Sequence, residues 1–133
     1  MKVDNIEVCE FLYFATTRCN CRCKHCVPQV YTGKDFEMSS KELIRKYEKS
    51  DFLRGNTVSV AGGEPFLKED LAEFIMYLDH KKIPTVISTN GWFTDRIENL
   101  IEKLEDNKTV RFAISIDGPE QMHDAIRRCP GIY

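Results

Sequence analysis

The chain alternates between short apolar runs and stretches in which apolar residues recur with the period of a helix. The apolar runs predict buried strands, because aromatic and aliphatic residues dominate them and turn residues follow them. These predicted strands cover Val8 to Thr16, Thr57 to Ala61, Thr85 to Thr89 and Thr109 to Ile116. Spacings of i, i+3, i+4 and i+7 between the strands predict amphipathic helices. The spaced residues are Leu71, Phe74, Ile75 and Leu78 in one helix, and Ile97, Leu100, Ile101 and Leu104 in another.

Capping and turn residues predict where these elements begin and end. Ser39 and Glu42 predict a capping box ahead of a first helix, whose inner face would hold Leu43, Ile44 and Tyr47. Thr94 is a predicted N-cap for the third helix, and a last helix is expected to begin near Glu120. Three predicted strands are followed by turn motifs. These motifs are Gly62-Gly63-Glu64-Pro65, Asn90-Gly91 and Asp117-Gly118-Pro119.

Four successive strand–helix units predict an α/β fold with a parallel sheet and right-handed crossovers. In the fourth strand, Val110, Phe112, Ile114 and Ile116 predict one apolar face that packs on helices. The other face becomes polar toward the carboxyl end of the strand, which is typical of a site in an α/β fold. The length, and the lack of any linker or repeat in the sequence, predict a single domain over residues 1–133.

The charge of the chain excludes some classes of partner. Its 133 residues include 19 basic and 21 acidic side chains, which are interleaved and give a net charge of −2. We therefore expect neither nucleic acid nor an anionic membrane surface as a partner. The N-terminal residues contain no uninterrupted apolar segment, so we expect no signal peptide or membrane helix and a cytoplasmic location.

Four of the six cysteines fall between residues 19 and 26. In a reducing cytosol, cysteines this dense predict a metal or redox site rather than disulfides. The spacing Cys19-x3-Cys23-x2-Cys26 offers three thiolates, one fewer than a closed tetrahedral site, and leaves one position open for chemistry. Cys9 and Cys129 stand apart and are interpreted as structural thiols.

Four motifs in register, between about Phe11 and Arg127, resemble the radical S-adenosylmethionine (radical SAM) superfamily. The cysteine loop is similar to the cluster loop of the family, and the glycine-rich turn follows it at the family's distance. The other two motifs are Ser88-Thr89-Asn90-Gly91 and Ser115-Ile116-Asp117-Gly118-Pro119, and the latter has a tail of His123-Asp124 with Arg127. The last of these resembles the SPASM-type branch, which matures peptides and cofactors. The resemblance implies four units of a six-unit (βα)6 partial TIM barrel, incomplete at the C-terminus.

The resemblance also implies the chemistry. Cys19, Cys23 and Cys26 would hold a [4Fe–4S] cluster by three irons, which leaves the fourth iron for the amine and carboxylate of S-adenosylmethionine. The reduced cluster would cleave S-adenosylmethionine to a 5′-deoxyadenosyl radical, which abstracts hydrogen from a substrate. That substrate would be a peptide or a cofactor precursor, and the electron donor a flavodoxin or a ferredoxin. No catalytic side chain is implied beyond the residues that hold these cofactors.

The resemblance places further residues at S-adenosylmethionine. Gly62 and Gly63 would let the backbone approach the methionine amine, and Arg127 would pair with the carboxylate. The other implied contacts are Glu64, Ser88 and Ser115, with His25 as a ring near the nucleotide. The ends of two strands add Asn90 and Asp117 as candidates.

Several of these residues also have a purely structural interpretation. Glu64 can cap the following helix, Arg127 can be a solvated helix charge, and Cys21 can simply pack in the core. Asp117 and Asn90-Gly91 are typical turn residues. His25 can instead be a zinc ligand, and with Cys21, Cys23 and Cys26 it can close a zinc site in a non-enzymatic module. No second couple of zinc ligands follows, however, as it does in zinc fingers and ribbons.

The sequence stops after the fourth predicted strand and one helix, which leaves two interpretations open. The chain can be a piece of a longer core, or a short protein whose sheet is completed by another chain. A truncated member that binds a cluster without turnover is a related alternative. A four-stranded parallel sheet leaves strand edges and an apolar inner face uncovered. We therefore expect the isolated chain to form oligomers or to have low stability, which light scattering and a thermal melt would test.

Overall fold

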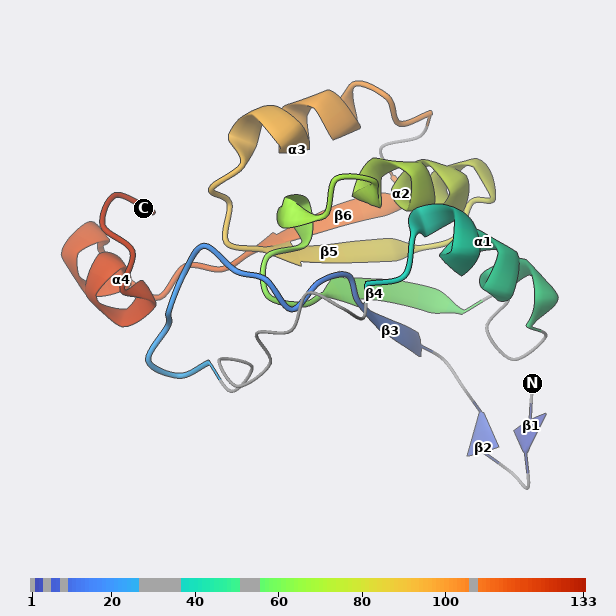
Figure 1. Ribbon diagram of the computed structural model, residues 1–133, viewed down its shortest axis with the longest axis horizontal. Coiled ribbons are helices and arrows are strands. Elements are labelled where there is room, and N and C mark those ends of the chain that lie inside the picture. The colour runs from blue at the N-terminus through green and yellow to red at the C-terminus, as the bar shows by residue number, and fades with distance from the viewer. Residues whose placement is uncertain (1, 4–5, 8–9, 27–36, 51–55, 106–107) are drawn as a thin grey trace.

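The computed structural model describes residues 2–3, 6–7, 10–26, 37–50, 56–105 and 108–133 (Figure 1). Cys9 and the start of the first predicted strand lie outside these ranges. So do the stretch that follows the cysteine loop and most of the predicted break after the first helix. The prediction of a single domain over the whole chain stays a prediction.

Four strands form a parallel sheet in the order β3-β4-β5-β6, which confirms the predicted α/β fold. They are β3 (Glu10–Phe14), β4 (Thr57–Ala61), β5 (Thr85–Thr89) and β6 (Val110–Ile114). The two central strands have the predicted bounds, and both outer strands end two residues earlier than predicted. Pairing nevertheless continues past the ends of β3 and β6. The Ala15 N–H donates to the Ala61 carbonyl at 2.8 Å, and the Ser115 N–H donates to the Thr89 carbonyl at 3.0 Å.

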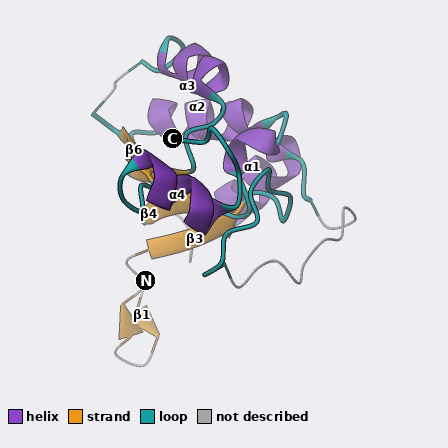
Figure 2. Ribbon diagram, turned by 90° about the vertical axis from the view of Figure 1, so that its left-hand side faces the viewer, coloured by secondary structure: helices purple, strands orange, loops and turns teal. Residues whose placement is uncertain are grey.

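Three helices cover one face of this sheet, and a fourth stands at the end where the strands point (Figures 1 and 2). The covering helices are α1 (Ser40–Lys49), α2 (Leu71–His80) and α3 (Thr94–Ile101), and the fourth is α4 (Glu120–Arg127). The predicted capping box of α1 is present, because Ser39 and Glu42 bond reciprocally. A small antiparallel pair, β1 (Lys2–Val3) and β2 (Ile6–Glu7), was not predicted.

Two local predictions were wrong. The glycine-rich motif is not only a turn, because Pro65 begins a short 3-10 helix, η3 (Pro65–Leu67). Proline suits a first helical position, where its missing N–H needs no partner. Thr94 is not an N-cap but the first residue of α3, and Phe93 is the cap. The Phe93 carbonyl accepts from the Arg96 and Ile97 N–H groups, and its ring packs on the core and under the Arg96 guanidinium, so core packing sets the start of this helix.

The hydrophobic core fills the space between the sheet and α1 to α3. Its fully buried members include Val58, Val60, Phe74, Leu78 and Ile87. The opposite face of the sheet is open in the described chain, where Leu12 and Phe14 are 52% and 58% exposed.

The predicted apolar face of the fourth strand is only partly covered. Val110 and Phe112 pack in the core, but Ile114 and Ile116 are 56% and 65% exposed. The prediction was wrong for these two residues. They lie toward the carboxyl end of the sheet, where α4 rather than α1 to α3 is the neighbouring helix (Figure 1).

Asp70 joins the start of α1 to the start of α2. Its Oδ2 accepts from the Ser40 N–H at 2.6 Å, and its Oδ1 lies 2.7 Å from the Lys68 Nζ. Ser40 is the first residue of α1, so the carboxylate satisfies a donor that has no partner within the helix, at the positive end of the helix dipole. Burial alone would raise the pKa of Asp70, but the Lys68 ammonium and the Ser40 N–H hold it below its usual value.

We expect Asp70→Asn to lower the free energy of unfolding by about 1–2 kcal/mol at pH 7, since it removes a charged cap of α1. Because the folded-state pKa is lowered, the ionised carboxylate stabilises the fold fully above the usual aspartate pKa of about 3.9. That stabilisation is lost as the pH falls through the folded-state pKa. Urea unfolding of both proteins between pH 7 and pH 3 would therefore show their difference shrinking at low pH. Asp95→Asn, an exposed first-turn residue of α3, is the control, and a difference independent of pH would contradict the expectation.

Candidate active site at the carboxyl ends of the strands

A cavity of about 190 Å³ lies where the cysteine loop meets the carboxyl ends of β4, β5 and β6 and the end of α4. Ten of the twelve predicted site residues line it. The two that do not are Glu64 and Asp117. The lining residues are Cys19, Cys21, Cys23, His25, Cys26, Ala61, Gly62, Gly63, Ser88, Thr89, Asn90, Ser115 and Arg127.

The three predicted ligand thiols share this cavity but differ in exposure. Cys19 is exposed, Cys26 is half-buried and Cys23 is buried. Burial raises the pKa of Cys19 and of Cys26, and the neighbouring Cys23 thiol raises both further. In the described part of the chain, no three His, Cys, Asp or Glu side chains converge on one metal ion. The three thiolates of a [4Fe–4S] cluster bind three different irons, so they need to stand farther apart than the ligands of one ion.

The cysteine loop is held by backbone bonds on both of its sides. On one side, the Gly63 N–H donates to the Thr16 carbonyl and the Glu64 N–H to the Arg18 carbonyl, both at 2.8 Å. On the other side, the N–H groups of Arg22 and Lys24 donate to the carbonyls of Arg127 and Ile126, at 3.1 and 2.9 Å. The loop therefore lies between the glycine-rich turn and the end of α4 and is bonded to both.

The two glycines are required by this close approach of two backbones. A Cβ on Gly62 would lie 2.4 Å from the Thr16 carbonyl oxygen, and one on Gly63 would lie 2.0 Å from that of Arg18. Gly62 also has a φ of +141°, which L side chains rarely adopt. The resemblance to the family had instead implied that Gly62 and Gly63 leave room for the methionine amine. Both residues do line the cavity, but the atoms that a side chain would meet first belong to the chain itself.

Arg127 is fixed at the floor of the cavity by two contacts. Its Nε donates to Asp117 Oδ2 at 2.6 Å, and its Nη1 lies 3.8 Å from the Cys23 sulfur. Burial alone would lower the pKa of Arg127, but Asp117 and the Cys23 thiol raise it. The buried His123 accepts the Asp117 N–H at its Nδ1, at 3.1 Å. Asp117 therefore serves here to position Arg127, and Arg127 is a buried, paired cation rather than a solvated charge.

Glu64 lies beneath the cavity, fully buried. Its Oε1 accepts from the Phe66 N–H at 3.1 Å and from the Thr89 hydroxyl at 2.7 Å, while its Oε2 accepts from the Asn90 N–H at 2.8 Å. The carboxyl group thus caps η3, as one interpretation of the sequence expected. It also joins the ends of β4 and β5 behind the cavity wall.

We expect Glu64→Gln to destabilise the fold by about 2–3 kcal/mol, because one amide N–H would face a buried N–H or hydroxyl donor and leave it unpaired. Chemical unfolding followed by circular dichroism would measure the loss. Glu69→Gln is the matched control, since Glu69 is exposed and should change stability by less than about 0.5 kcal/mol. Equal effects of the two substitutions would contradict this role of Glu64.

Sequence reasoning missed the contacts that support the lining residues. The Asn90 amide donates to Asn20 Oδ1 at 2.8 Å and lies 3.4 Å from the Cys21 sulfur, so it links β5 to the cysteine loop. Cys21 also packs with Cys129 and Ile132, in agreement with its structural interpretation. Thr89 belongs to the Ser88-Thr89-Asn90-Gly91 motif, but the sequence did not indicate that its hydroxyl donates to the buried Glu64 carboxylate.

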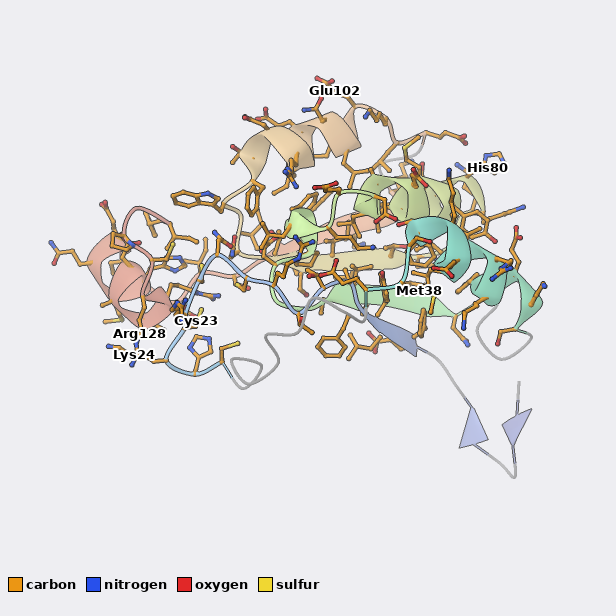
Figure 3. The ribbon with its side chains drawn as sticks, in the orientation of Figure 1. Cys23, Lys24, Met38, His80, Glu102 and Arg128 are labelled. Atoms are coloured by element: carbon orange, nitrogen blue, oxygen red, sulfur yellow. The ribbon has the colours of Figure 1, made fainter. Side chains whose placement is uncertain are left out.

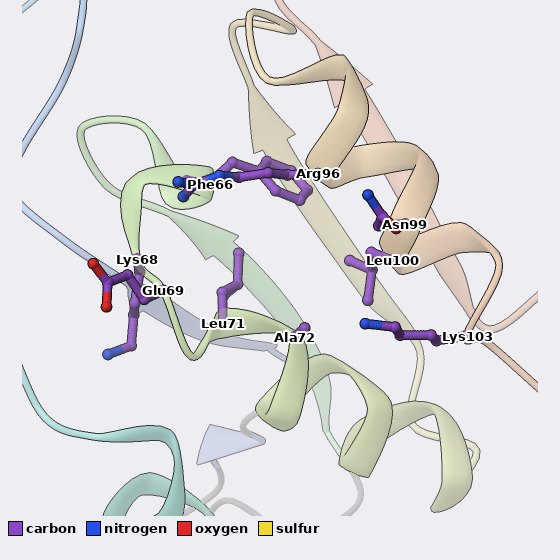
Figure 4. A pocket seen from close by; sticks show the side chains of 9 residues that line it. All are labelled: Phe66, Lys68, Glu69, Leu71, Ala72, Arg96, Asn99, Leu100 and Lys103. Atoms are coloured by element: carbon purple, nitrogen blue, oxygen red, sulfur yellow. The ribbon is translucent and has the colours of Figure 1, made fainter.

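A second cavity, of about 240 Å³, lies between α2 and α3 on the helical side of the molecule (Figure 4). Arg96 spans its rim and donates from Nη1 to the Phe66 carbonyl at 2.6 Å. None of the predicted site residues lines it. It is separate from the cavity that the cysteine loop closes.

The family model described as the radical SAM superfamily matches residues 13–132, which includes every predicted site residue. This chain belongs to the radical SAM superfamily. The resemblance found in the four motifs is thereby confirmed, and so is the fold, a parallel sheet and helices that match part of the radical SAM barrel. Members of this superfamily use a [4Fe–4S] cluster and S-adenosylmethionine.

The chain is also similar to curated proteins and to solved structures. The chain is 31% identical to an AdoMet-dependent heme synthase of Nitratidesulfovibrio vulgaris, over 98% of this chain and 36% of that protein. It is 36% identical to a GTP 3′,8-cyclase of Aliarcobacter butzleri, over 87% of this chain and 35% of that protein. A crystal structure of Streptococcus suis SuiB bound to S-adenosylmethionine has the same fold, with a TM-score of 0.73 and 19% identity. That match covers 91% of this chain and 28% of SuiB.

This radical SAM chain thus spans about a third of the length of the curated relatives it matches. Among the residues that the structure describes, no helix has both the length and the apolar character needed to cross a bilayer.

Proposed function

We propose that this chain binds a [4Fe–4S] cluster through Cys19, Cys23 and Cys26 and reductively cleaves S-adenosylmethionine. The observation that carries the proposal is that these three thiols share one cavity with Gly62, Gly63, Ser88, Ser115 and Arg127. Three thiols and several hydrogen-bonding groups around one cavity suit a cluster with one open iron and an amino-acid ligand beside it.

The donor groups of the cavity fit this pair of cofactors. Three thiols are the usual ligand type for a cluster, and the buried Asn20 amide nitrogen in the same loop has no acceptor among the described residues. Arg127 uses two of its five N–H donors on Asp117 and Cys23, which leaves donors for a carboxylate. When bound, the cluster and S-adenosylmethionine would supply an electron and a 5′-deoxyadenosyl radical for hydrogen abstraction from a substrate.

The proposed roles of the chain's own residues follow from their positions. Arg127, oriented by Asp117 and indirectly by His123, would bind the carboxylate of S-adenosylmethionine. Ser88 and Ser115, at the ends of β5 and β6, would offer hydroxyl groups to its polar parts, and His25 a ring near the nucleotide. Glu64 would act only through the backbone that it holds, since its carboxyl oxygens already accept three bonds.

The substrate class proposed is a peptide or a cofactor precursor. The relatives are named for heme and for GTP cyclisation, and SuiB has been crystallised with its precursor peptide SuiA. The proposed electron donor is a flavodoxin or a ferredoxin, in a cytoplasmic setting. The alternatives to this enzymatic function are a member of the family that binds the cluster without turnover and a structural zinc module.

Anaerobic reconstitution would separate these functions. The enzyme predicts about four irons and four sulfides per chain, an electron paramagnetic resonance signal that S-adenosylmethionine perturbs, and release of 5′-deoxyadenosine under dithionite. Zinc retention without cluster uptake would favour the structural module. Cluster uptake without 5′-deoxyadenosine would favour the non-catalytic member.

A further inference from the structure

Three exposed cations border the cysteine loop. Arg22 and Lys24 belong to the loop, and Arg128 follows the last residue of α4. The backbone bonds from the loop to residues 126 and 127 bring them to the same edge of the molecule. Figure 3 shows Lys24 and Arg128 at the same end of the molecule as Cys23. We call Arg22, Lys24 and Arg128 the cationic edge.

The charge of this edge differs from that of the chain as a whole. Residues 18–26 and 120–133 contain five Lys and Arg side chains and two acidic ones, Glu120 and Asp124, although the chain has a net charge of −2. The Asp124 carboxylate accepts from the Gly131 and Tyr133 N–H groups. Two of the five, Arg18 and Arg127, pair with carboxylates. The cationic edge itself forms no ion pair with any residue that the structure describes. All three side chains are exposed to solvent.

The cationic edge does not face the cavity. None of its three residues lines the cavity, whereas Cys19, Cys23 and Cys26 do. A small substrate bound in the cavity would be recognised by the lining residues. The outward cations instead suit a macromolecule that approaches the outside of the loop.

We propose that the cationic edge is a docking surface for an acidic protein that carries one electron to the cluster. This inference rests on the proposed function, because it assumes a cluster held by the same loop. In this step the reduced carrier loses one electron and the cluster gains one, and no bond forms or breaks. Cations on the loop that also bears the ligands attract an acidic carrier to the place where transfer is shortest. Such steering raises association rates by about 10- to 1,000-fold at low salt.

The three positions can be changed without disturbing the backbone that holds the loop. Arg22 and Lys24 make their bonds to α4 through main-chain N–H groups, which any non-proline residue provides. Arg128 has a left-handed backbone, with φ 52° and ψ 41°, and asparagine tolerates that conformation better than arginine does. The triple variant Arg22→Glu, Lys24→Glu and Arg128→Asn should therefore fold and take up the cluster.

The test uses the full-length, cluster-reconstituted protein and a flavodoxin hydroquinone as the acidic carrier. Anaerobic stopped-flow absorbance would give the second-order rate constant of cluster reduction. We expect the triple variant to lower this constant at least about tenfold at low salt, and to approach wild type at about 1 M salt, where the Debye length is about 3 Å. Titration calorimetry with oxidised flavodoxin should show the same salt-dependent loss of affinity.

Arg45→Glu is the control, because Arg45 is an exposed cation on α1, at the other end of the molecule (Figure 1). It should change the rate constant less than about twofold, since one reversed charge at the other end of the molecule acts over a much longer distance on a carrier at the loop. An unchanged rate in the triple variant, an equal loss in the control, or a loss that persists at high salt would overturn the proposal. Loss of binding to an acidic peptide with no change in the reduction rate would also overturn it, in favour of an anionic substrate. Wild-type cleavage of S-adenosylmethionine under dithionite tests the proposed function separately, because dithionite replaces the carrier.

Discussion

Replacement of Cys19, Cys23 or Cys26 by alanine is expected to abolish cluster assembly, from about four irons per chain to less than about one. Each of the three thiols lines the cavity, and a [4Fe–4S] cluster held by two thiolates would be exposed to solvent and lost. Iron and sulfide analysis and the visible absorbance of the reconstituted protein would measure the change. Cleavage of S-adenosylmethionine should disappear in parallel.

Two other cysteines provide matched controls. Cys21 lies in the same loop and Cys129 packs in the same cluster of residues, but neither belongs to the proposed ligand set, so Cys21→Ala and Cys129→Ala should keep about four irons. Burial, and the nearby Cys129 thiol, raise the pKa of Cys21. Loss of the cluster in Cys21→Ala, with retention in Cys19→Ala, would contradict the proposed ligand set.

Gly63→Ala is expected to destabilise the protein by more than about 4 kcal/mol, or to prevent the cysteine loop from closing. The added Cβ would lie 2.0 Å from the Arg18 carbonyl oxygen, and that oxygen is held by the Glu64 N–H. The oxygen cannot move away without breaking this bond. Since a domain of this kind is stable by only about 5–15 kcal/mol, the loss would be visible in a urea melt and in cluster uptake.

Gly131→Ala is the control for this effect. Gly131 has a positive φ, but a Cβ there would meet no atom within 4 Å, so its cost is backbone strain alone, about 1–2 kcal/mol. The difference between the two variants measures the close approach of the two backbones. A Gly63→Ala protein that melts like Gly131→Ala and still binds iron would show that the loop can shift.

The sequence predicted most accurately the strands in the centre of the sheet, where buried residues alternate regularly along the chain. β4 and β5 have the predicted bounds, because both are central strands in which alternate residues are fully buried. The outer strands β3 and β6 were predicted too long, although one backbone hydrogen bond to the neighbouring strand follows the end of each. The start of α3 was missed because Phe93 packs in the core, which capping propensity at Thr94 does not reveal.

The residues of the candidate site were predicted largely from the positions of their motifs relative to the predicted strands. Ser88 lies near the end of β5 and Asn90, Ser115 and Asp117 follow β5 or β6, and the parallel sheet brings the carboxyl ends of those strands to one edge. The supporting contacts depend on how loops approach one another, which spacing alone does not determine. Glu64 beneath Thr89 and Asn90 is one such case. The glycines that pack on residues 16 and 18 are another.

The cysteine loop is bonded on one side to the glycine-rich turn and on the other to the end of α4. The loop is completed by α4, and Cys23 and Arg127 are 104 positions apart in the chain. During synthesis, the thiols leave the ribosome long before the residues that hold the far side of their loop. The bonds from Arg22 and Lys24 to the end of α4 can form only after α4 is in place. Amide exchange at Arg22 and Lys24 during refolding should accordingly become protected last.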